Sequence, residues 1–218
     1  LNLTASETFF PEKRLFFLEG NEVFTVMPRD DFMSIYRDAV NEDYATTSRQ
    51  VYLRDYVPLP VSLLNTRRIG GTANQVDVPA DVTPNRGQRD VPTDLVGAAK
   101  VTGAAGDFRY GMLAAVENDV SWIGSDSAGL ATDIEGPGRD FAVARLTYED
   151  IGRTRRSLGY MGTFVGGPLY DAAVHSIDAH YGAGSGKFKA DVQLISSDRA
   201  DIQGYGGMFD VTYAQSNG

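Results

Sequence analysis

The feature that most constrains this chain is a period-two alternation of apolar and polar residues that starts near residue 95. In the segment 187–196, KFKADVQLIS, every second residue from Phe188 to Leu194 is apolar, and charged or polar residues lie between them. Successive side chains of a β-strand point to opposite faces, so this pattern predicts strands with one apolar and one polar face. The predicted strands cover residues 95–102, 108–117, 141–148, 156–165, 174–181, 187–196 and 207–214.

The links between these strands alternate in length. GAAGD, EDIGRTR and GAGSG are short, whereas residues 118–140 form a long link and GGPLYDAA and SDRADIQGYG are intermediate. Short links at one end and longer links at the other are typical of an antiparallel up-and-down meander. Membrane barrels show the same asymmetry between their two ends.

Composition limits the functional classes. The chain has 218 residues, a net charge of -9 and no cysteine. A general nucleic-acid partner needs a basic face, so we expect none, and the absence of cysteine excludes disulfides and thiolate metal sites. No stretch approaches the ~18 apolar residues of a membrane-spanning helix. The chain begins at Leu1 without a visible signal peptide, so we expect it to be an internal part of a longer protein.

Two architectures fit the predicted strands. A soluble antiparallel sandwich would turn the apolar faces toward a core, and a transmembrane β-barrel would turn them toward lipid. Three features favour the barrel: the long links lie at one end, the apolar faces mix Ala and Gly with large residues, and aromatic residues recur at strand ends. The aromatic residues are Phe108, Tyr148, Tyr181, Phe188 and Tyr213.

The organisation of the chain changes near residue 94. Residues 1–94 hold seven of the nine prolines, and residues 71–94 have the composition of a polar loop. Residues 28–50 have helical spacing that indicates a short helix within a longer loop. We therefore expect 1–94 to supply the first barrel strands with long polar loops, and 95–218 to supply about seven consecutive strands.

The opening segment carries the most specific motif. Residues 1–24, LNLTASETFFPEKRLFFLEGNEVF, place Pro11-Glu12-Lys13-Arg14 between the aromatic pairs Phe9-Phe10 and Phe16-Phe17. This segment resembles the signature of a bacterial outer-membrane-barrel domain of unknown function, NLT-x-x-E-x-FFPEKR-x-FFLEG. Family members also carry an RRIG element and a strand similar to GAKVTG, which residues 67–70 and 97–113 match. The chain departs from the family pattern at Ala5-Ser6 and at Leu15.

The resemblance implies an outer membrane β-barrel of more than eight strands, of which this chain is a fragment that does not close by itself. It implies contact with outer membrane lipid and an upstream carbohydrate-binding-like module of the family-nine type. It implies no established activity, cofactor or catalytic residue. Association with that module suggests a non-catalytic role in uptake or surface binding of glycans. A soluble β-sandwich that serves as a carbohydrate-binding module or as a hydrolase accessory domain is the alternative.

At a barrel wall, aromatic residues can face lipid while charges face the lumen. We therefore expect a luminal charge cluster that either fixes strand register or a plug, or contacts a substrate. Its members are Glu7, Glu12, Lys13, Arg14, Glu19, Arg67 and Arg68.

Other chemistry-bearing patterns are weaker. GAGSGKF, residues 182–188, departs from the phosphate-loop pattern. His175 and His180 are five residues apart on one strand, so they point to opposite faces and do not share a metal. Trp122 lies in the long link, where it could stack on a sugar ring. Acidic residues of the same link fit ordinary loop chemistry better than calcium binding, and a glycosidase pair of carboxylates remains a third alternative.

Overall fold

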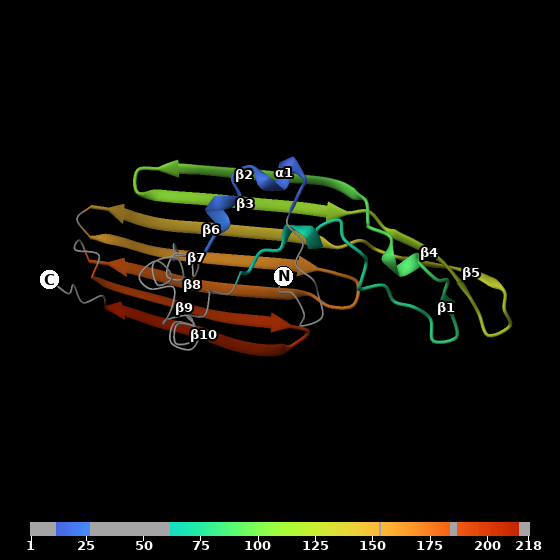
Figure 1. Cartoon of the computed structure of the whole chain (residues 1–218). Helices are drawn as coiled ribbons and strands as arrows, with labels where there is room; N and C mark the ends of the chain where they lie inside the picture. The colour runs from blue at the N-terminus through green and yellow to red at the C-terminus, as the bar shows by residue number, and fades with distance from the viewer. Residues whose placement is uncertain (1–11, 27–61, 153, 184–186, 214–218) are drawn as a thin grey trace, which may run out of the picture.

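The computed structural model describes residues 12–26, 62–152, 154–183 and 187–213 (Figure 1). In the described residues, four short helical turns precede the large sheet: α1 (Leu15–Leu18), η1 (Asn21–Phe24), η3 (Thr66–Arg68) and η4 (Gln88–Asp90). No helix in these described ranges is both long and apolar enough to cross a membrane. The strands are β1 (Thr83–Pro84), β2 (Leu95–Ala105), β3 (Phe108–Glu117), β4 (Val120–Ser125), β5 (Ala131–Gly136), β6 (Asp140–Ile151), β7 (Arg155–Gly166), β8 (Ala172–Gly182), β9 (Phe188–Arg199) and β10 (Ile202–Tyr213).

Seven of the strands form one antiparallel meander, in the order β10-β9-β8-β7-β6-β3-β2. Each of the seven strands expected from the alternation is present, so the all-β antiparallel meander is confirmed. Within the described residues β2 and β10 are each paired on one side only, and the sheet does not close on itself. The expectation that residues 1–94 supply further barrel strands stays a prediction, because residues 1–11 and 27–61 lie outside the described residues. The short helix expected within 28–50 lies there too.

The β9–β10 connection differs from the expected loop. Residues 197–206 belong almost wholly to the two strands, and the chain reverses at Ala200 and Asp201, whose φ angles are 50° and 66°. Two consecutive residues with positive φ are the requirement of a tight primed turn, whose twist matches that of the strands. The polar residues that suggested a loop belong instead to paired strands.

The long link 118–140 was also expected to be a loop, and that expectation is wrong. It contains the β4–β5 hairpin, which pairs with the two-residue strand β1 in a second, three-stranded sheet (Figure 1). Trp122 and Ile134 are buried there against Val82. Each strand of the hairpin has six residues, and turn-forming residues flank both. Such short strands give too few alternations to stand out in the sequence.

The two faces of the large sheet have opposite character. We call the face toward α1 and η1 the inner face, and the other the outer face (Figure 1). Large apolar side chains are exposed on the outer face: Val101, Met112, Leu146, Tyr160, Phe164, Ile177, Leu194 and Phe209. The inner face buries charged and polar side chains: Glu117, Arg145, Ser157, Thr163, Ser176, Asp178, His180, Asp191 and Gln193.

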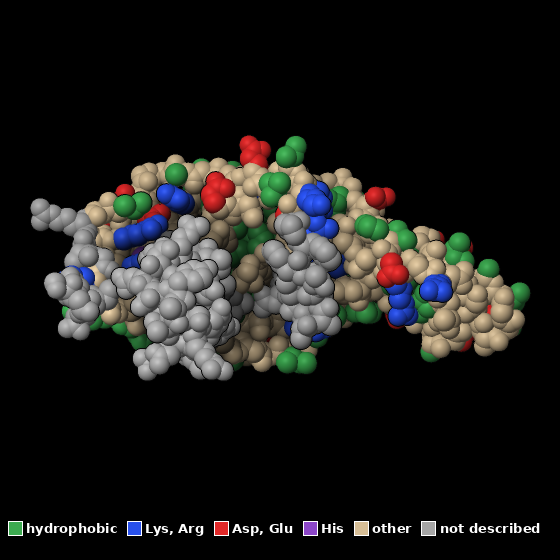
Figure 2. Space-filling model, viewed as in Figure 1, with side chains coloured by type: hydrophobic (Ala, Val, Ile, Leu, Met, Phe, Trp, Pro, Cys, Tyr) green, Lys and Arg blue, Asp and Glu red, His purple; other side chains and the backbone are tan. Residues whose placement is uncertain are grey.

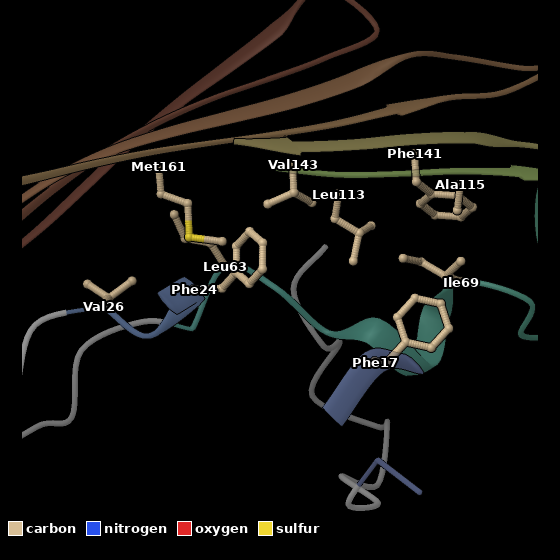
Figure 3. Packing of buried hydrophobic residues seen from close by; sticks show 10 residues of the cluster. All are labelled: Phe17, Phe24, Val26, Leu63, Ile69, Leu113, Ala115, Phe141, Val143 and Met161. Carbon is tan, nitrogen blue, oxygen red and sulfur yellow. The ribbon is translucent and has the colours of Figure 1, made fainter. Parts of the chain in front are cut away.

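The hydrophobic core lies between the inner face and the N-terminal segments 12–26 and 62–75. Phe17, Phe24, Val26, Leu63 and Ile69 from those segments pack on Leu113, Ala115, Phe141, Val143 and Met161 of β3, β6 and β7 (Figure 3). Residues far apart in the sequence therefore share one core. The helical turns are too short to be stable alone, and this packing holds them in place.

Met161 tests which face is the interior. Its side chain is 0 % exposed, whereas Leu158 of the same strand is 56 % exposed on the outer face. We expect Met161→Ala to lower the free energy of unfolding by about 2–5 kcal/mol, since it leaves a cavity in a packed core. Leu158→Ala should cost less than half as much. Denaturant titration of both variants in the same medium measures the difference, and equal costs would contradict the assignment.

Candidate functional site

The charged part of the opening motif forms a compact cluster with the threonine of η3. Arg14 Nε donates to Glu12 Oε1 at 3.0 Å, and Arg14 Nη2 donates to Glu12 Oε2 at 2.8 Å. Thr66 Oγ1 donates to Glu12 Oε2 at 2.7 Å. We call Glu12, Arg14 and Thr66 the N-terminal cluster. It joins two segments that are 54 residues apart in the sequence.

Arg14 also ties the opening motif to the RRIG element. Its Nη1 donates to the carbonyl oxygen of Ile69 at 2.6 Å, and its Nη2 donates to that of Thr66 at 2.7 Å. The guanidinium carbon lies 4.2 Å from the centre of the Phe17 ring, within range of a cation–π contact. Arg14 thus bonds the next segment of the chain, while Phe17 beside it enters the core.

A buried ion pair continues this network onto the sheet. Arg139 Nε donates to Glu117 Oε2 at 2.7 Å and Arg139 Nη2 donates to Glu117 Oε1 at 2.8 Å. The Gly70 N–H donates to Glu117 Oε1 at 2.9 Å, and Arg139 Nη2 also donates to the Arg68 carbonyl at 3.2 Å. The RRIG element is therefore clamped by its backbone between Arg14 and the Glu117–Arg139 pair.

The structure brings together only some of the residues of the predicted charge cluster. Glu12 and Arg14 are brought together, and Glu7 lies outside the described residues. Arg68 contributes its carbonyl oxygen to the clamp, and the carbonyl of Glu19 accepts a hydrogen bond from Lys100 Nζ of β2. The side chains of Lys13, Glu19 and Arg67 are exposed. The side chains of Glu12 and Arg14 thus bond each other directly.

The N-terminal cluster lowers the pKa of Glu12. Burial by itself raises the pKa of this carboxyl, but hydrogen bonds from Arg14, Thr66 and the Lys13 N–H favour the ionised form and lower it from 4.5 to about 2. The side chain of Glu12 is 8 % exposed, and that of Arg14 is 40 % exposed, so solvent screens the pair in part.

This shift predicts a pH dependence of stability. The folded pKa lies below the unfolded pKa, so the stabilisation is complete above about 4.5 and is lost as the pH falls toward about 2. We expect Glu12→Gln to cost roughly 1–3 kcal/mol at pH 7, discounted for screening, and to flatten the stability profile in that pH window. Denaturant titrations at pH 7, 4.5 and 2.5 measure both effects. A variant with the same slope as the parent would contradict this assignment.

A second buried ion pair crosses the middle of the inner face. Both terminal nitrogens of Arg145 on β6 donate to the carboxylate of Asp178 on β8, with Nη2 2.9 Å from Oδ2. β7 lies between these strands, and there Gly159 pairs with both Thr147 and Asp178. A Cβ built on Gly159 would lie 2.5 Å from Arg145 Nη2. Glycine at this position therefore opens the path along which Arg145 reaches across a whole strand.

We expect Gly159→Ala to destabilise the protein by about 1–3 kcal/mol, because the new methyl group displaces Arg145 and weakens a buried, hydrogen-bonded pair. Gly206→Ala on β10 is the matched control, since a Cβ there meets no atom within 4 Å. Thermal and denaturant unfolding of both variants provide the comparison. If Gly159→Ala were as benign as the control, the close approach of Arg145 would be wrong.

A pocket of about 260 Å³ opens beside this ion pair, between η1 and strands β3, β6 and β7. Three arginines line it together with two glutamates and four smaller residues: Arg109, Arg145, Arg155, Glu22, Glu149, Val23, Thr25, Thr147 and Ser157. Glu149 holds two of the arginines, with Oε1 2.7 Å from Arg155 Nη2 and Oε2 3.5 Å from Arg109 Nη2. Basic side chains gather at this end of the sheet in Figure 2.

The histidines point to opposite faces, as predicted. His180 is buried on the inner face, and its Nδ1 lies 2.6 Å from Asp191 Oδ1. His175 is exposed on the outer face, where its Nδ1 lies 2.8 Å from the Tyr160 hydroxyl. Across the described ranges, no group of three or more potential metal ligands occurs.

The other sequence candidates have structural explanations. Trp122 is 6 % exposed in the core of the small sheet, so the expectation that it could stack on a sugar ring is wrong. Asp126 Oδ1 accepts the N–H groups of Ala128 and Leu130 at 2.9 and 2.8 Å and so stabilises the β4–β5 turn. That is the ordinary acidic loop chemistry expected for this link.

Period-two counting places Glu117, Arg145 and Asp178 at polar positions of their predicted strands, but the sequence assigns them no role. Their only signal in the sequence is a charge at such a position. No family model, curated protein or solved structure matches this chain. Its function is therefore inferred from its own residues.

Proposed function

We propose that the seven-stranded sheet is part of the wall of a transmembrane β-barrel in a bacterial outer membrane, with its outer face toward lipid. In this proposal the chain is a non-catalytic envelope component. The residues that carry the proposal are the exposed apolar side chains of the outer face. Lipid is the solvent that favours such a surface, whereas water leaves it uncovered.

The orientation of the polar residues supports the same proposal. Asp191 is 5 % exposed and Gln193 is 0 % exposed on β9, whereas Leu194 is 58 % exposed. A soluble sandwich would turn Leu194 inward and the polar residues toward water. A barrel wall turns them the other way, as the described strands do.

Aromatic side chains on the outer face add support. Phe108 and Tyr148 contact each other, with ring centres 5.3 Å apart, and Tyr181 and Phe188 do so at 6.0 Å. All four lie near the strand ends that adjoin the β2–β3, β6–β7 and β8–β9 connections. Aromatic rings at this level are typical of the girdle where a membrane barrel meets the headgroup region. The strands have 10 to 12 residues, which suits a tilted membrane crossing.

The N-terminal segments would then lie inside the lumen. They cover β3, β6 and β7 through Phe17, Phe24 and Ile69, and they are clamped by Arg14 and the Glu117–Arg139 pair. This supports a structural role for the FFPEKR and RRIG elements, in which they hold a plug against the wall. The lumen would be at least partly filled.

The ligand class rests on the family resemblance of the opening motif, which associates the domain with a carbohydrate-binding-like module. We propose uptake or surface binding of glycans on that basis. A glycosidase role needs a carboxylate that is free to act on the sugar. In the arginine-lined pocket both oxygens of Glu149 face guanidinium groups, which disfavours such chemistry.

The first test uses the natural full-length protein in a bacterial outer membrane fraction. A closed barrel that resists detergent should migrate differently on a gel before and after boiling. We expect a heat-dependent shift and retention in the membrane after a high-salt wash. A protein that leaves with the soluble fraction and migrates identically in both conditions would rule out the membrane wall.

Two substitutions on one strand distinguish more sharply whether the outer face contacts lipid or water. Ile177 lies midway along the outer face of β8 and Tyr181 lies at its turn end. In a bilayer we expect Ile177→Arg to cost about 2–4 kcal/mol and Tyr181→Arg only about 0–1 kcal/mol, because the cost of a charge depends on depth. On a water-exposed surface both should fall within about 0.5 kcal/mol of the parent. Unfolding free energies in lipid bilayers measure the difference.

A further inference from the structure

Two buried polar groups beside the arginine-lined pocket have no hydrogen-bond partner. They are Arg145 Nε and Ser157 Oγ, in residues that are 3 % and 6 % exposed. Buried polar groups are nearly always paired, because leaving one unmade costs about 1–3 kcal/mol. Both residues line the same pocket. Of the three buried side-chain atoms without a hydrogen-bond partner in the described residues, two therefore lie at one cavity of the inner face.

The two groups call for a specific kind of partner atom. Arg145 Nε carries a hydrogen and no lone pair, so only an acceptor can satisfy it. The serine hydroxyl can donate to the same class of atom. The two terminal nitrogens of Arg145 are already directed at Asp178, which fixes the guanidinium plane and leaves Nε as the nitrogen without an acceptor.

The lining of the pocket is rich in guanidinium donors. It carries three arginines and two glutamates, and Asp178 compensates the charge of Arg145. Glu149 lies against Arg109 and Arg155, and Glu22 is exposed at the side of η1. Guanidinium groups recognise planar carboxylates by paired hydrogen bonds. The side chains of Arg109 and Arg155 are about half exposed, at 53 % and 46 %, and so can turn toward a ligand.

We propose that this pocket binds the carboxylate group of a small organic acid. One carboxylate oxygen accepts from Arg145 Nε and the Ser157 hydroxyl, and Arg109 and Arg155 compensate the charge. The volume of about 260 Å³ lies at the small end of ligand pockets, which suits a molecule of one ring rather than a polymer. This inference goes beyond the proposed membrane role and does not depend on it, because it uses only residues of the inner face and η1.

The first experiment compares a sugar acid with the sugar that has a hydroxymethyl group in place of its carboxylate, and with a different anion. Glucuronate, glucose and inorganic phosphate are titrated into the folded chain, and calorimetry or the change in melting temperature reports binding. We expect saturable binding of glucuronate and at least about tenfold weaker binding of glucose, in keeping with the strength of charged hydrogen bonds. Equal affinity for glucose and glucuronate, stronger binding of phosphate, or no binding of glucuronate would each overturn the carboxylate assignment.

Ser157→Ala tests the pocket itself. The hydroxyl has no partner in the unliganded protein, so its removal should leave the free energy of unfolding unchanged or slightly raised. Glucuronate should then bind at least about tenfold more weakly. Unchanged glucuronate affinity in a folded Ser157→Ala variant would place the ligand elsewhere and overturn the proposal.

Arg155 and Arg156 supply a matched pair of variants. Each guanidinium lies 2.7 Å from a carboxylate of β6, Arg155 from Glu149 on the pocket side and Arg156 from Asp150 on the opposite side of the strand. We expect Arg155→Gln to weaken glucuronate binding severalfold and Arg156→Gln to leave it unchanged. Equal losses of glucuronate affinity in the two variants would indicate a general effect of charge and would contradict binding at this pocket.

The membrane proposal and the pocket proposal fail separately. If the chain partitions to water, the titrations are made in buffer, and if it requires detergent, they are made in micelles. Glucuronate binding by a soluble protein would retain the pocket and reject the membrane wall. A membrane protein whose migration depends on heating but that binds no carboxylate would retain the membrane wall and reject the pocket.

Discussion

Paired charges on the inner side of the sheet are the constraint on which the rest of the structure depends. Glu12, Glu117, Glu149 and Asp178 each hold at least one guanidinium. A buried charge without a partner costs several kcal/mol, whereas a paired and hydrogen-bonded charge is tolerated. These pairs let a sheet bury its polar face, which most sheets turn toward water. The apolar face is then left exposed.

The same pairs connect segments that are distant in the sequence. Arg14 joins the opening motif to the RRIG element, Arg139 joins that element to β3, and Arg145 links β6 with β8 across Gly159. Apolar packing of Phe17, Phe24 and Ile69 supplies the bulk of the contact area. Directional hydrogen bonds decide where those side chains dock, because apolar contacts alone accept many arrangements.

The proposed carboxylate pocket also depends on how the buried charged groups are paired. Every guanidinium nitrogen of Arg139 has an acceptor, whereas Nε of Arg145 has none. That nitrogen and the Ser157 hydroxyl belong to residues that line the pocket between η1 and strands β3, β6 and β7. A site that is satisfied everywhere would be structural. An arginine-lined cavity in which a buried guanidinium nitrogen has no acceptor is prepared for a ligand.

The positions of the seven strands of the large sheet followed from sequence alone, since alternation is a local property that each of these strands carries by itself. Glu117, Arg145 and Asp178 could likewise be placed on one face by counting. The six-residue strands of the β4–β5 hairpin and the turn at Ala200 escaped because their signals are too short or too polar to separate from loops.

The sequence by itself determined the strands, the alternation of their faces and the charged and aromatic makeup of the opening motif. Only the tertiary structure decided that the polar face is the covered one, that Glu12 meets Thr66 and that Arg145 crosses Gly159 to Asp178. The physical reason is the separation along the sequence of the residues on which each feature depends. Alternation depends on the neighbouring residues of one strand, whereas an ion pair requires two segments tens of residues apart to meet in register, and the linear order of residues does not state that register.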